Sequence, residues 1–352
     1  MSRAGPAYGT HESDTALTAT VTTDDDIRQM RAALRGVLGT SDPDAVPTPD
    51  PEWRAGWPML AELGLTAFCV PEEKDGYGMQ SAVAAGAAQE LGAALHGSPF
   101  AALTAAGHAL AGSDRPEAGE VLAAVVAGET VCAFGVLDAT AGRAWIVDGV
   151  PGAEALVLVD PTTADATLLV GSSAWAVEVP ADPFDVSRAS AAVTVDVSQG
   201  VALGAAPVAL DLYRLLLAAD AVGCVQRMHD RTVTYAGQRI AFGKPIGGFQ
   251  AVQHRLADHA VRARGMALVV AEAAAVLDAG SDDATRQVAI AAVSVHGNSV
   301  RILHDLLQLT GGIGFTWEYG LHFYERRAHQ DARLAGGSRA AVRSLVEIEG
   351  WS

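Results

Sequence analysis

The residues best suited to chemistry lie in two glycine-rich segments of the C-terminal half. The first is "QRIAFGKPIGGFQ", residues 238–250, where Arg239 and Phe242 stand next to glycine turns, and the second is "QLTGGIGF", residues 308–315. A guanidinium can pair with phosphate oxygens, an aromatic ring can lie against a planar ligand, and glycines let backbone approach closely. Each feature alone also has an ordinary explanation, because arginines are usually surface charges and glycines commonly end helices. Neither segment has the G-x-G-x-x-G spacing of a Rossmann site.

The surrounding sequence predicts three domains that position these segments. Residues 1–24 are polar and threonine-rich, which predicts a flexible tail. Periodic Ala/Leu-rich runs predict an N-terminal helical domain at 25–128, and short β-like runs between turn residues predict a small β domain at 129–204. Long amphipathic runs then predict a C-terminal four-helix bundle at 205–352. The expected fold class is therefore a multidomain α+β chain.

Individual stretches of the sequence predict where the helices and strands lie. Before residue 128 we expect helices in four runs, "DDIRQMRAALRGVLG", "PEWRAGWPMLAELGL", "QSAVAAGAAQELGAALH" and "RPEAGEVLAAVVAG". The β-like runs are six, "TVCAFGVLD", "AWIVDG", "EALVLVD", "ATLLVG", "AWAVEV" and "AAVTVDV". In the last block, Gly280 and Gly311 are expected to end long helices. Those helices carry few charges, so apolar surface should remain for self-association.

Composition limits the class of protein. Half of the 352 residues (50%) are hydrophobic, which excludes wholesale disorder, and a net charge of −17 repels nucleic acid and anionic lipid. Cys69, Cys132 and Cys224 form no C-x-x-C pair, which predicts packing thiols in a reducing compartment and no metal site. The sequence shows no signal peptide and no apolar run of about 18 residues. We therefore expect a cytoplasmic protein without a membrane span.

Longer segments around these motifs resemble a known family. The stretches "YAGQRIAFGKPIGGFQAVQHRLAD" and "LQLTGGIGFTWEYGLHFYERRA" are similar to the two hallmark segments of acyl-CoA dehydrogenases, and "AELGLTAFCVPEEKDGYGM" resembles part of their first domain. The resemblance implies the acyl-CoA dehydrogenase fold, with FAD as cofactor. It implies that Arg239 and Phe242 contact FAD bound mainly by a neighbouring subunit. Further positions that hold the dinucleotide would be Gln250, Gln308, Gly311 and Gly312.

The positions of the family's catalytic base are not acidic in this sequence. The resemblance implies that a carboxylate removes the α-proton of an acyl-CoA thioester while the flavin takes a hydride from the β-carbon. The two positions that supply this carboxylate in the family correspond to Tyr213 and Ala335. Alanine cannot take a proton, and a phenol with a pKa of about 10 is a poor base at neutral pH. Tyr213 should either fill the acyl pocket or be an ordinary buried tyrosine whose hydroxyl bonds to a neighbour.

Four nearby acids could replace the missing base, namely Asp211, Asp220, Glu325 and Asp331. On a helix, Asp211 lies about 160° round from Tyr213 and should face away from it. Glu325 and Asp331 lie in "YERRAHQDAR", where pairing with arginines of the same segment is expected. We expect surface ion pairs rather than catalysis from these acids.

The β block also departs from the family. It is truncated and lacks the T-E-P-x-x-G-S-D-like loop, and Trp145–Ile146 is only a loose match to the W-I-T/S-like strand. The sequence thus resembles the shortened subunit of actinobacterial-type heterotetrameric acyl-CoA dehydrogenases that act on steroid-derived CoA thioesters. That resemblance implies a degenerate chain that shares FAD with a catalytically complete partner subunit and meets acyl-CoA through the complex. The alternatives are a self-sufficient homo-oligomeric dehydrogenase with a displaced base, and a flavin-free scaffold.

Overall fold

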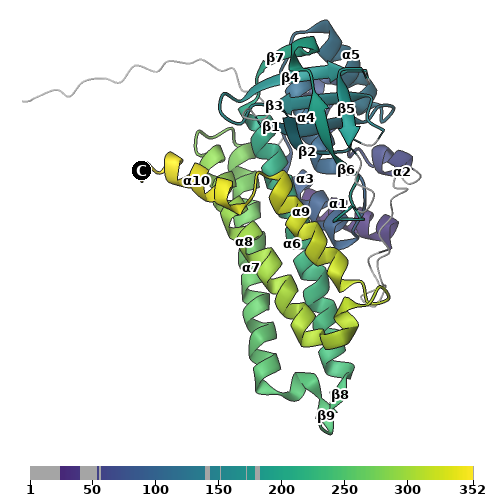
Figure 1. The fold of residues 1–352 in the computed structure, drawn as a ribbon, viewed down its shortest axis with the longest axis vertical. Helices are drawn as coiled ribbons and strands as arrows, with labels where there is room; N and C mark the ends of the chain where they lie inside the picture. Colours follow the sequence, from purple (N-terminus) through teal and green to yellow (C-terminus); the bar gives the residue numbers. More distant parts are fainter. Residues whose placement is uncertain are drawn as a thin grey trace, which may run out of the picture.

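The computed structural model places a β-sheet at one end of the molecule and long helices that run away from it to the other (Figure 1). The expected flexible tail, residues 1–24, lies outside the described residues except for Asp24, which begins the first helix. The structure describes residues 24–39, 54, 57–138, 143–150, 152–171, 173–178 and 183–351.

Short helices precede the sheet. They are α1 (Asp24–Leu38), α2 (Trp57–Glu62), η2 (Glu72–Lys74), α3 (Ser81–Ala93), α4 (Phe100–Ala111) and α5 (Pro116–Val126). Four of the five α-helices lie in the runs expected to be helical, and α4 was missed. Every residue of α4 except His108 is buried, so its sequence has no alternation of polar and apolar faces. A helix that is apolar all round gives no helical period to detect.

Within the described residues, the large sheet has seven strands in the order β5-β6-β2-β1-β3-β4-β7. Their bounds are β1 (Cys132–Asp138), β2 (Arg143–Asp148), β3 (Ala155–Val159), β4 (Asp165–Val170), β5 (Trp175–Glu178), β6 (Ser190–Val195) and β7 (Val201–Ala205), with η3 (Val197–Gln199) before β7. Strands β1 and β3 pair in parallel, and the other neighbours are antiparallel. The first six match the β-like runs. The edge strand β7 was not expected, because "VALGA" is short and contains a glycine.

The C-terminal helices form the expected four-helix bundle. They are α6 (Pro207–Gln238), α7 (Gln250–Asp278), α8 (Ala284–Thr310) and α9 (Leu321–Leu334), with α10 (Ser338–Ile348) beside α8, and the connecting pieces are β8 (Ile240–Ala241), β9 (Lys244–Pro245), η4 (Ile246–Gly248) and η5 (Gly311–Phe315). Gly280 and Gly311 follow α7 and α8 with φ of +61° and +67°, as the sequence predicts for helix ends. In the part of the chain that the structure describes, no helix combines the length and the apolar character needed to cross a bilayer.

Helix α6 is the centre of the molecule. Its residues from Leu215 to Ala219 are all fully buried, so every face of this stretch is covered. Helix α3 approaches α6 so closely that a Cβ added at Gly92 or at Gly223 would collide with backbone of the other helix. This contact fixes α6 between the N-terminal helices and the rest of the bundle, with Tyr213 near its start.

Candidate functional site

The β8–β9 hairpin carries the first group of candidate residues at the far end of the bundle (Figure 1). Phe242 and Gly243 form its turn with φ of +53° and +82°, a pair of positive angles that suits a two-residue hairpin. The Phe242 side chain is 96% exposed. A positive φ at a bulky residue is strained, and such strain is concentrated at functional sites. Arg239, at the C-cap of α6 just before the hairpin, is also exposed.

The structure brings all six residues expected to contact FAD to this same end. Gln250 begins α7, and Gln308 lies in the last turn of α8, followed by Gly311 and Gly312 in η5; all four are exposed. A hydrogen bond joins the end of α6 to the end of α8. The hydroxyl of Tyr235 in α6 donates to the Thr310 carbonyl of α8 over 3.4 Å.

The backbone at this end is open to a ligand. No described side chain caps the N-terminus of α7, so the N–H groups of Gln250 and Ala251 remain available to a ligand, while that of Val252 donates to the Phe249 carbonyl. A Cβ built at Gly311 or Gly312 would meet nothing within 4 Å. Lys244 lies 4.3 Å from the Phe249 ring centroid and adds positive charge beside Arg239.

Apolar side chains surround these polar groups at the same end. Ile240 is 58% exposed on the hairpin, and Phe315 and Trp317, which follow the glycines of η5, are 58% and 65% exposed. Monomeric proteins rarely leave several large apolar side chains exposed together, so such groups commonly mark an interface. We call Ile240, Phe242, Phe315 and Trp317 the hairpin-end patch.

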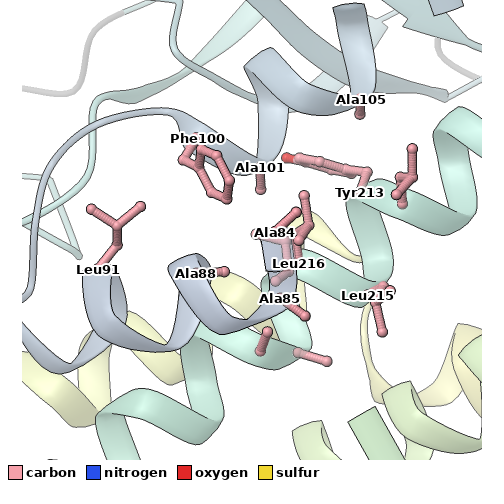
Figure 2. Close-up of a cluster of buried hydrophobic side chains, with 14 of the residues drawn as sticks. Ala84, Ala85, Ala88, Leu91, Phe100, Ala101, Ala105, Tyr213, Leu215 and Leu216 are labelled. Atoms are coloured by element: carbon pink, nitrogen blue, oxygen red, sulfur yellow. The ribbon is translucent and has the colours of Figure 1, made fainter. Parts of the chain in front are cut away.

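Tyr213 occupies the interior between α6, the sheet and the N-terminal helices. Its ring lies 4.8 Å from that of Phe134 in β1, and Figure 2 shows it beside Ala101 and Ala105 of α4. Its hydroxyl is buried and has no hydrogen-bond partner among the residues that the structure describes, where the alternative of a hydroxyl bonded to a neighbour is therefore wrong. Burial, and then the neighbouring Asp148 side chain, raise the pKa of Tyr213 well above its usual value. The phenol is therefore an even weaker base than the sequence indicated.

The other family position offers no base either. Ala335 is buried at the C-cap of α9. Of the acids considered as substitutes, Asp211 is buried and accepts a hydrogen bond from the Thr285 hydroxyl at 2.7 Å. Glu325 lies 3.2 Å from His304 of α8, not beside an arginine of its own helix as expected.

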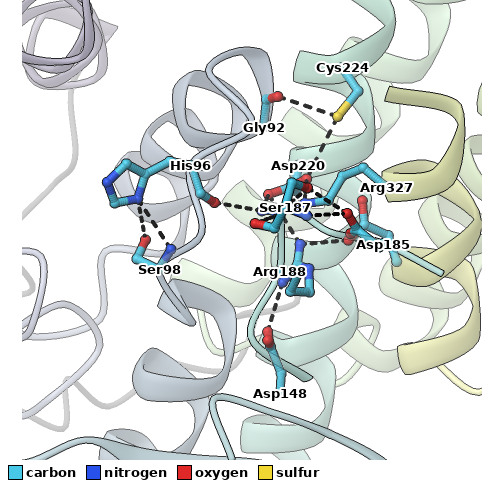
Figure 3. Close-up of polar contacts among 11 residues, drawn as sticks. Gly92, His96, Ser98, Asp148, Asp185, Ser187, Arg188, Asp220, Cys224 and Arg327 are labelled. Carbon is cyan, nitrogen blue, oxygen red and sulfur yellow. Dashed lines mark hydrogen bonds and ion pairs between the residues drawn. The ribbon is translucent and has the colours of Figure 1, made fainter. Parts of the chain in front are cut away.

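Asp220 and Asp331 are not surface ion pairs, which corrects the sequence expectation. Both are buried in what we call the interdomain charge cluster, part of which is shown in Figure 3. Its members are four acids and two arginines, namely Asp148, Asp185, Asp220, Asp331, Arg188 and Arg327. Asp331 Oδ1 lies 2.6 Å from Arg188 Nη2, and both side chains are buried. This pair joins α9 to the segment before β6.

The pKa values of the two acids are shifted in opposite directions. Asp220 accepts two hydrogen bonds from Arg327, at 3.0 and 2.9 Å. Burial raises the pKa of Asp220, but Arg327 and then Arg188 outweigh it, and the result lies below the usual value. Burial and the neighbouring Asp220 carboxylate raise the pKa of Asp331 well above its usual value. Each carboxyl is thus held by a guanidinium inside the protein.

Sequence reasoning missed the three cluster members contributed by the sheet side, Asp148, Asp185 and Arg188. Asp148 and Arg188 are 40 residues apart, and Arg188 meets Asp331 only after another 143 residues, so no local spacing could reveal the cluster. Trp145 and Ile146 lie in β2, but their side chains are outside the described set.

Comparison with known proteins settles the family. The chain is 34% identical to the acyl-CoA dehydrogenase IpdE2 of Mycobacterium tuberculosis over 84% of its own length and 86% of that protein. It belongs to the acyl-CoA dehydrogenase family. Residues 203–347 also match the model of the acyl-CoA dehydrogenase C-terminal domain.

Solved acyl-CoA dehydrogenases share the fold. A chain of the steroid acyl-CoA dehydrogenase Tcur3481–Tcur3483, in a G363A variant, superposes with a TM-score of 0.81 at 23% identity, covering 93% of this chain and 98% of that one. A chain of the ChsE4–ChsE5 complex from Mycobacterium tuberculosis gives a TM-score of 0.78 at 22% identity, covering 94% and 99%.

The hairpin end has the features that a flavin dinucleotide needs. Proteins of the acyl-CoA dehydrogenase fold include one solved with FAD. Free N–H groups at the start of α7 and the exposed Arg239 suit a pyrophosphate, while the Phe242 ring is free to lie on a planar group. All of these groups face outward from the chain. Within the described residues, no group of three or more His, Cys, Asp or Glu side chains is arranged to hold a metal ion.

Proposed function

We propose that this acyl-CoA dehydrogenase family chain is a catalytically degenerate subunit that completes the FAD site of a catalytically complete partner subunit. The observation that carries the proposal is the hairpin turn, in which a strained Phe242 projects 96% exposed from the end of the bundle. A bulky aromatic residue held in this conformation and left in solvent has no role in this chain's own core. Its ring, Arg239 and the glycines of η5 are available to a flavin held by another subunit.

The absence of a base supports the same role. The family positions hold Tyr213 and Ala335, both buried, and Asp211, Asp220 and Asp331 are buried and bound to other side chains. In the complex, a bound FAD would supply the hydride acceptor, and the partner would supply the carboxylate that removes the α-proton. This chain would hold part of the dinucleotide and exclude water from it.

The descriptions of the solved relatives support a proposal for the substrate class. Tcur3481–Tcur3483 is described as a steroid acyl-CoA dehydrogenase, and ChsE4–ChsE5 is a complex of two named chains. We propose a steroid-derived CoA thioester as the substrate of the complex. The acyl group would lie in the partner, because in this chain Tyr213 fills the space between α4, α6 and β1.

The experiment compares the chain purified alone with the chain co-expressed with acyl-CoA dehydrogenase chains encoded near it. Alone, it should retain little FAD and reduce no dye with acyl-CoA, whereas the co-isolated complex should be yellow and active. Stoichiometric flavin and turnover from the chain alone would instead establish a self-sufficient dehydrogenase with a displaced base. A co-isolated complex whose flavin content is insensitive to this chain would indicate a flavin-free scaffold.

A further inference from the structure

The interdomain charge cluster joins three parts of the chain and has no part in the proposed flavin contact. The sheet side supplies Asp148 from β2 and, from the segment 183–190 before β6, Asp185 and Arg188. The bundle supplies Asp220 from α6 and, from α9, Arg327 and Asp331.

Arg188 is the bridge between the sheet and the bundle. Its Nη1 lies 2.7 Å from Asp148 Oδ2 and its Nη2 lies 2.6 Å from Asp331 Oδ1, and the side chains of all three residues are at most 1% exposed. Among the described residues, Asp148 Oδ1 is buried without a hydrogen-bond partner, whereas Asp331 also shares a hydrogen bond with Asp220. Removal of either side chain would leave a buried Arg188 N–H group without its acceptor, which is destabilising.

Arg327 extends the cluster to the N-terminal helices. Besides its two bonds to Asp220, it donates to the Ser187 carbonyl and to the His96 carbonyl, each at 3.0 Å (Figure 3). One guanidinium therefore connects α6, the segment before β6 and the turn after α3. Any movement of the sheet relative to the bundle would break these bonds together.

The charges do not balance. Four carboxylates face two guanidiniums, so full ionisation would leave two excess negative charges in the interior, where an unpaired charge is costly. We propose that the cluster is a proton-dependent lock between the sheet and the bundle, in which Asp148 and Asp331 remain protonated and whose hold weakens as they ionise. Both contact Arg188 through one oxygen, and Asp331 also shares a hydrogen bond with Asp220, which requires a proton on one of these two acids.

The electrostatics agree with this assignment. Burial is the largest cause that raises the pKa of both Asp148 and Asp331. The other titratable groups that face the cluster are Tyr213 and Cys224 of α6, whose pKa values are also raised by burial, so they stay neutral and supply no compensating charge. A raised native pKa means that the folded chain binds protons that the unfolded chain releases. The free energy of unfolding should therefore fall as pH rises from about 4 towards the native pKa values.

The test measures thermal unfolding of the full chain without flavin between pH 6 and pH 8. Asp331→Asn replaces the protonated carboxyl by a neutral amide that can still accept from Arg188. It should unfold at a higher temperature than the wild type at pH 8, by a few degrees, and roughly halve the fall in midpoint from pH 6 to pH 8. Asp148→Asn should act in the same direction. Asp114→Asn, at an exposed acid, is the matched control and should change neither quantity.

Two further measurements keep the proposal testable if a variant does not fold. Infrared spectra of the wild type at pH 8 should contain the band of a protonated carboxyl, and hydrogen exchange of residues 183–190, corrected for its intrinsic rate, should quicken as pH rises. An unchanged pH profile in both asparagine variants, or a wild type without a protonated-carboxyl band, would overturn the proposal. Because flavin takes no part in these experiments, their failure would leave the proposed function untouched.

Discussion

At the scale of single residues, the proposed flavin contact depends on side chains that this chain does not use for itself. Arg239 is exposed at the C-cap of α6, and no hydrogen bond from its side chain to the described part of the chain is found. Phe242 is more exposed still, at a strained φ. Residues of this kind contribute little to the stability of the chain on its own, so their substitution separates ligand binding from folding.

Arg239→Ala is expected to weaken FAD retention by the co-isolated complex about ten- to a hundredfold, because charge-assisted hydrogen bonds are commonly worth about 1.5–3 kcal/mol. Unfolding of the isolated chain should change by less than about 0.5 kcal/mol. Flavin released on dilution, followed by fluorescence, measures the effect. Arg115→Ala, at another exposed arginine before α5, is the control and should leave flavin binding unchanged. Equal retention in both variants would contradict the assignment of Arg239.

Tyr213 fills space with its ring, and its hydroxyl makes no hydrogen bond in the described structure. Tyr213→Phe should therefore be neutral or stabilise the chain by up to about 1 kcal/mol, since it removes a buried unpaired polar group. Tyr213→Ala should cost about 3–5 kcal/mol, because it leaves a cavity beside Phe134. Urea unfolding of both variants measures the difference. A marked loss of stability in Tyr213→Phe would show that the hydroxyl has a partner after all.

At the scale of elements, the position of α6 depends on glycines rather than on large side chains. A Cβ at Gly223 would collide with the Gln89 carbonyl of α3, and one at Gly92 would collide with the Asp220 carbonyl of α6. The two helices therefore touch backbone to backbone. This close approach sets where Tyr213 and Asp220 lie relative to the sheet.

Gly223→Ala should destabilise the chain by several kcal/mol, although alanine is the better helix former by about 1 kcal/mol. The cause is the displacement of α3, which no side-chain rotation can relieve because the colliding atom belongs to backbone. Gly237→Ala in the same helix is the control, since nothing lies within 4 Å of its added Cβ, and it should be neutral or slightly stabilising. Thermal unfolding decides between them. Similar stability of the two variants would mean that α3 and α6 are not in close contact.

At the scale of the whole molecule, the two ends differ in what they leave exposed to solvent. The sheet end is locked to the bundle by the interdomain charge cluster, while the hairpin end leaves Ile240, Phe242, Phe315 and Trp317 in solvent. Exposed apolar side chains gathered at one end of a molecule commonly mark an interface. The expected consequence is association through the hairpin-end patch.

Phe242→Asp should weaken association with the partner subunit by about 2 kcal/mol, roughly thirtyfold, because aromatic anchors dominate interfaces and a carboxylate there would also repel a dinucleotide. The melting temperature of the isolated chain should not change, since the side chain is almost wholly exposed. Val170→Asp, at an exposed apolar residue of β4, is the control. Analytical ultracentrifugation of the co-expressed chains measures the effect. Equal association of both variants would place the interface elsewhere.

The sequence by itself determined the features that depend on local patterns. The helical runs, six of the seven strands and the glycine ends of α7 and α8 follow from periodicity and turn residues, which act between near neighbours. The family resemblance rested on contiguous motifs and is confirmed by the comparisons. The roles of Arg239, Phe242 and the glycines of η5 remain predictions.

Only the tertiary structure decided which polar groups meet across the core. Asp331 had the sequence context of a surface ion pair, yet packing of the sheet against α9 removes it from water and brings Arg188 to it. Helix α4 was missed for a related reason, because burial on all sides erases the pattern that marks a helix. Burial and partners at long range are properties of the packed chain, since they depend on which surfaces come together, and residue spacing does not encode that.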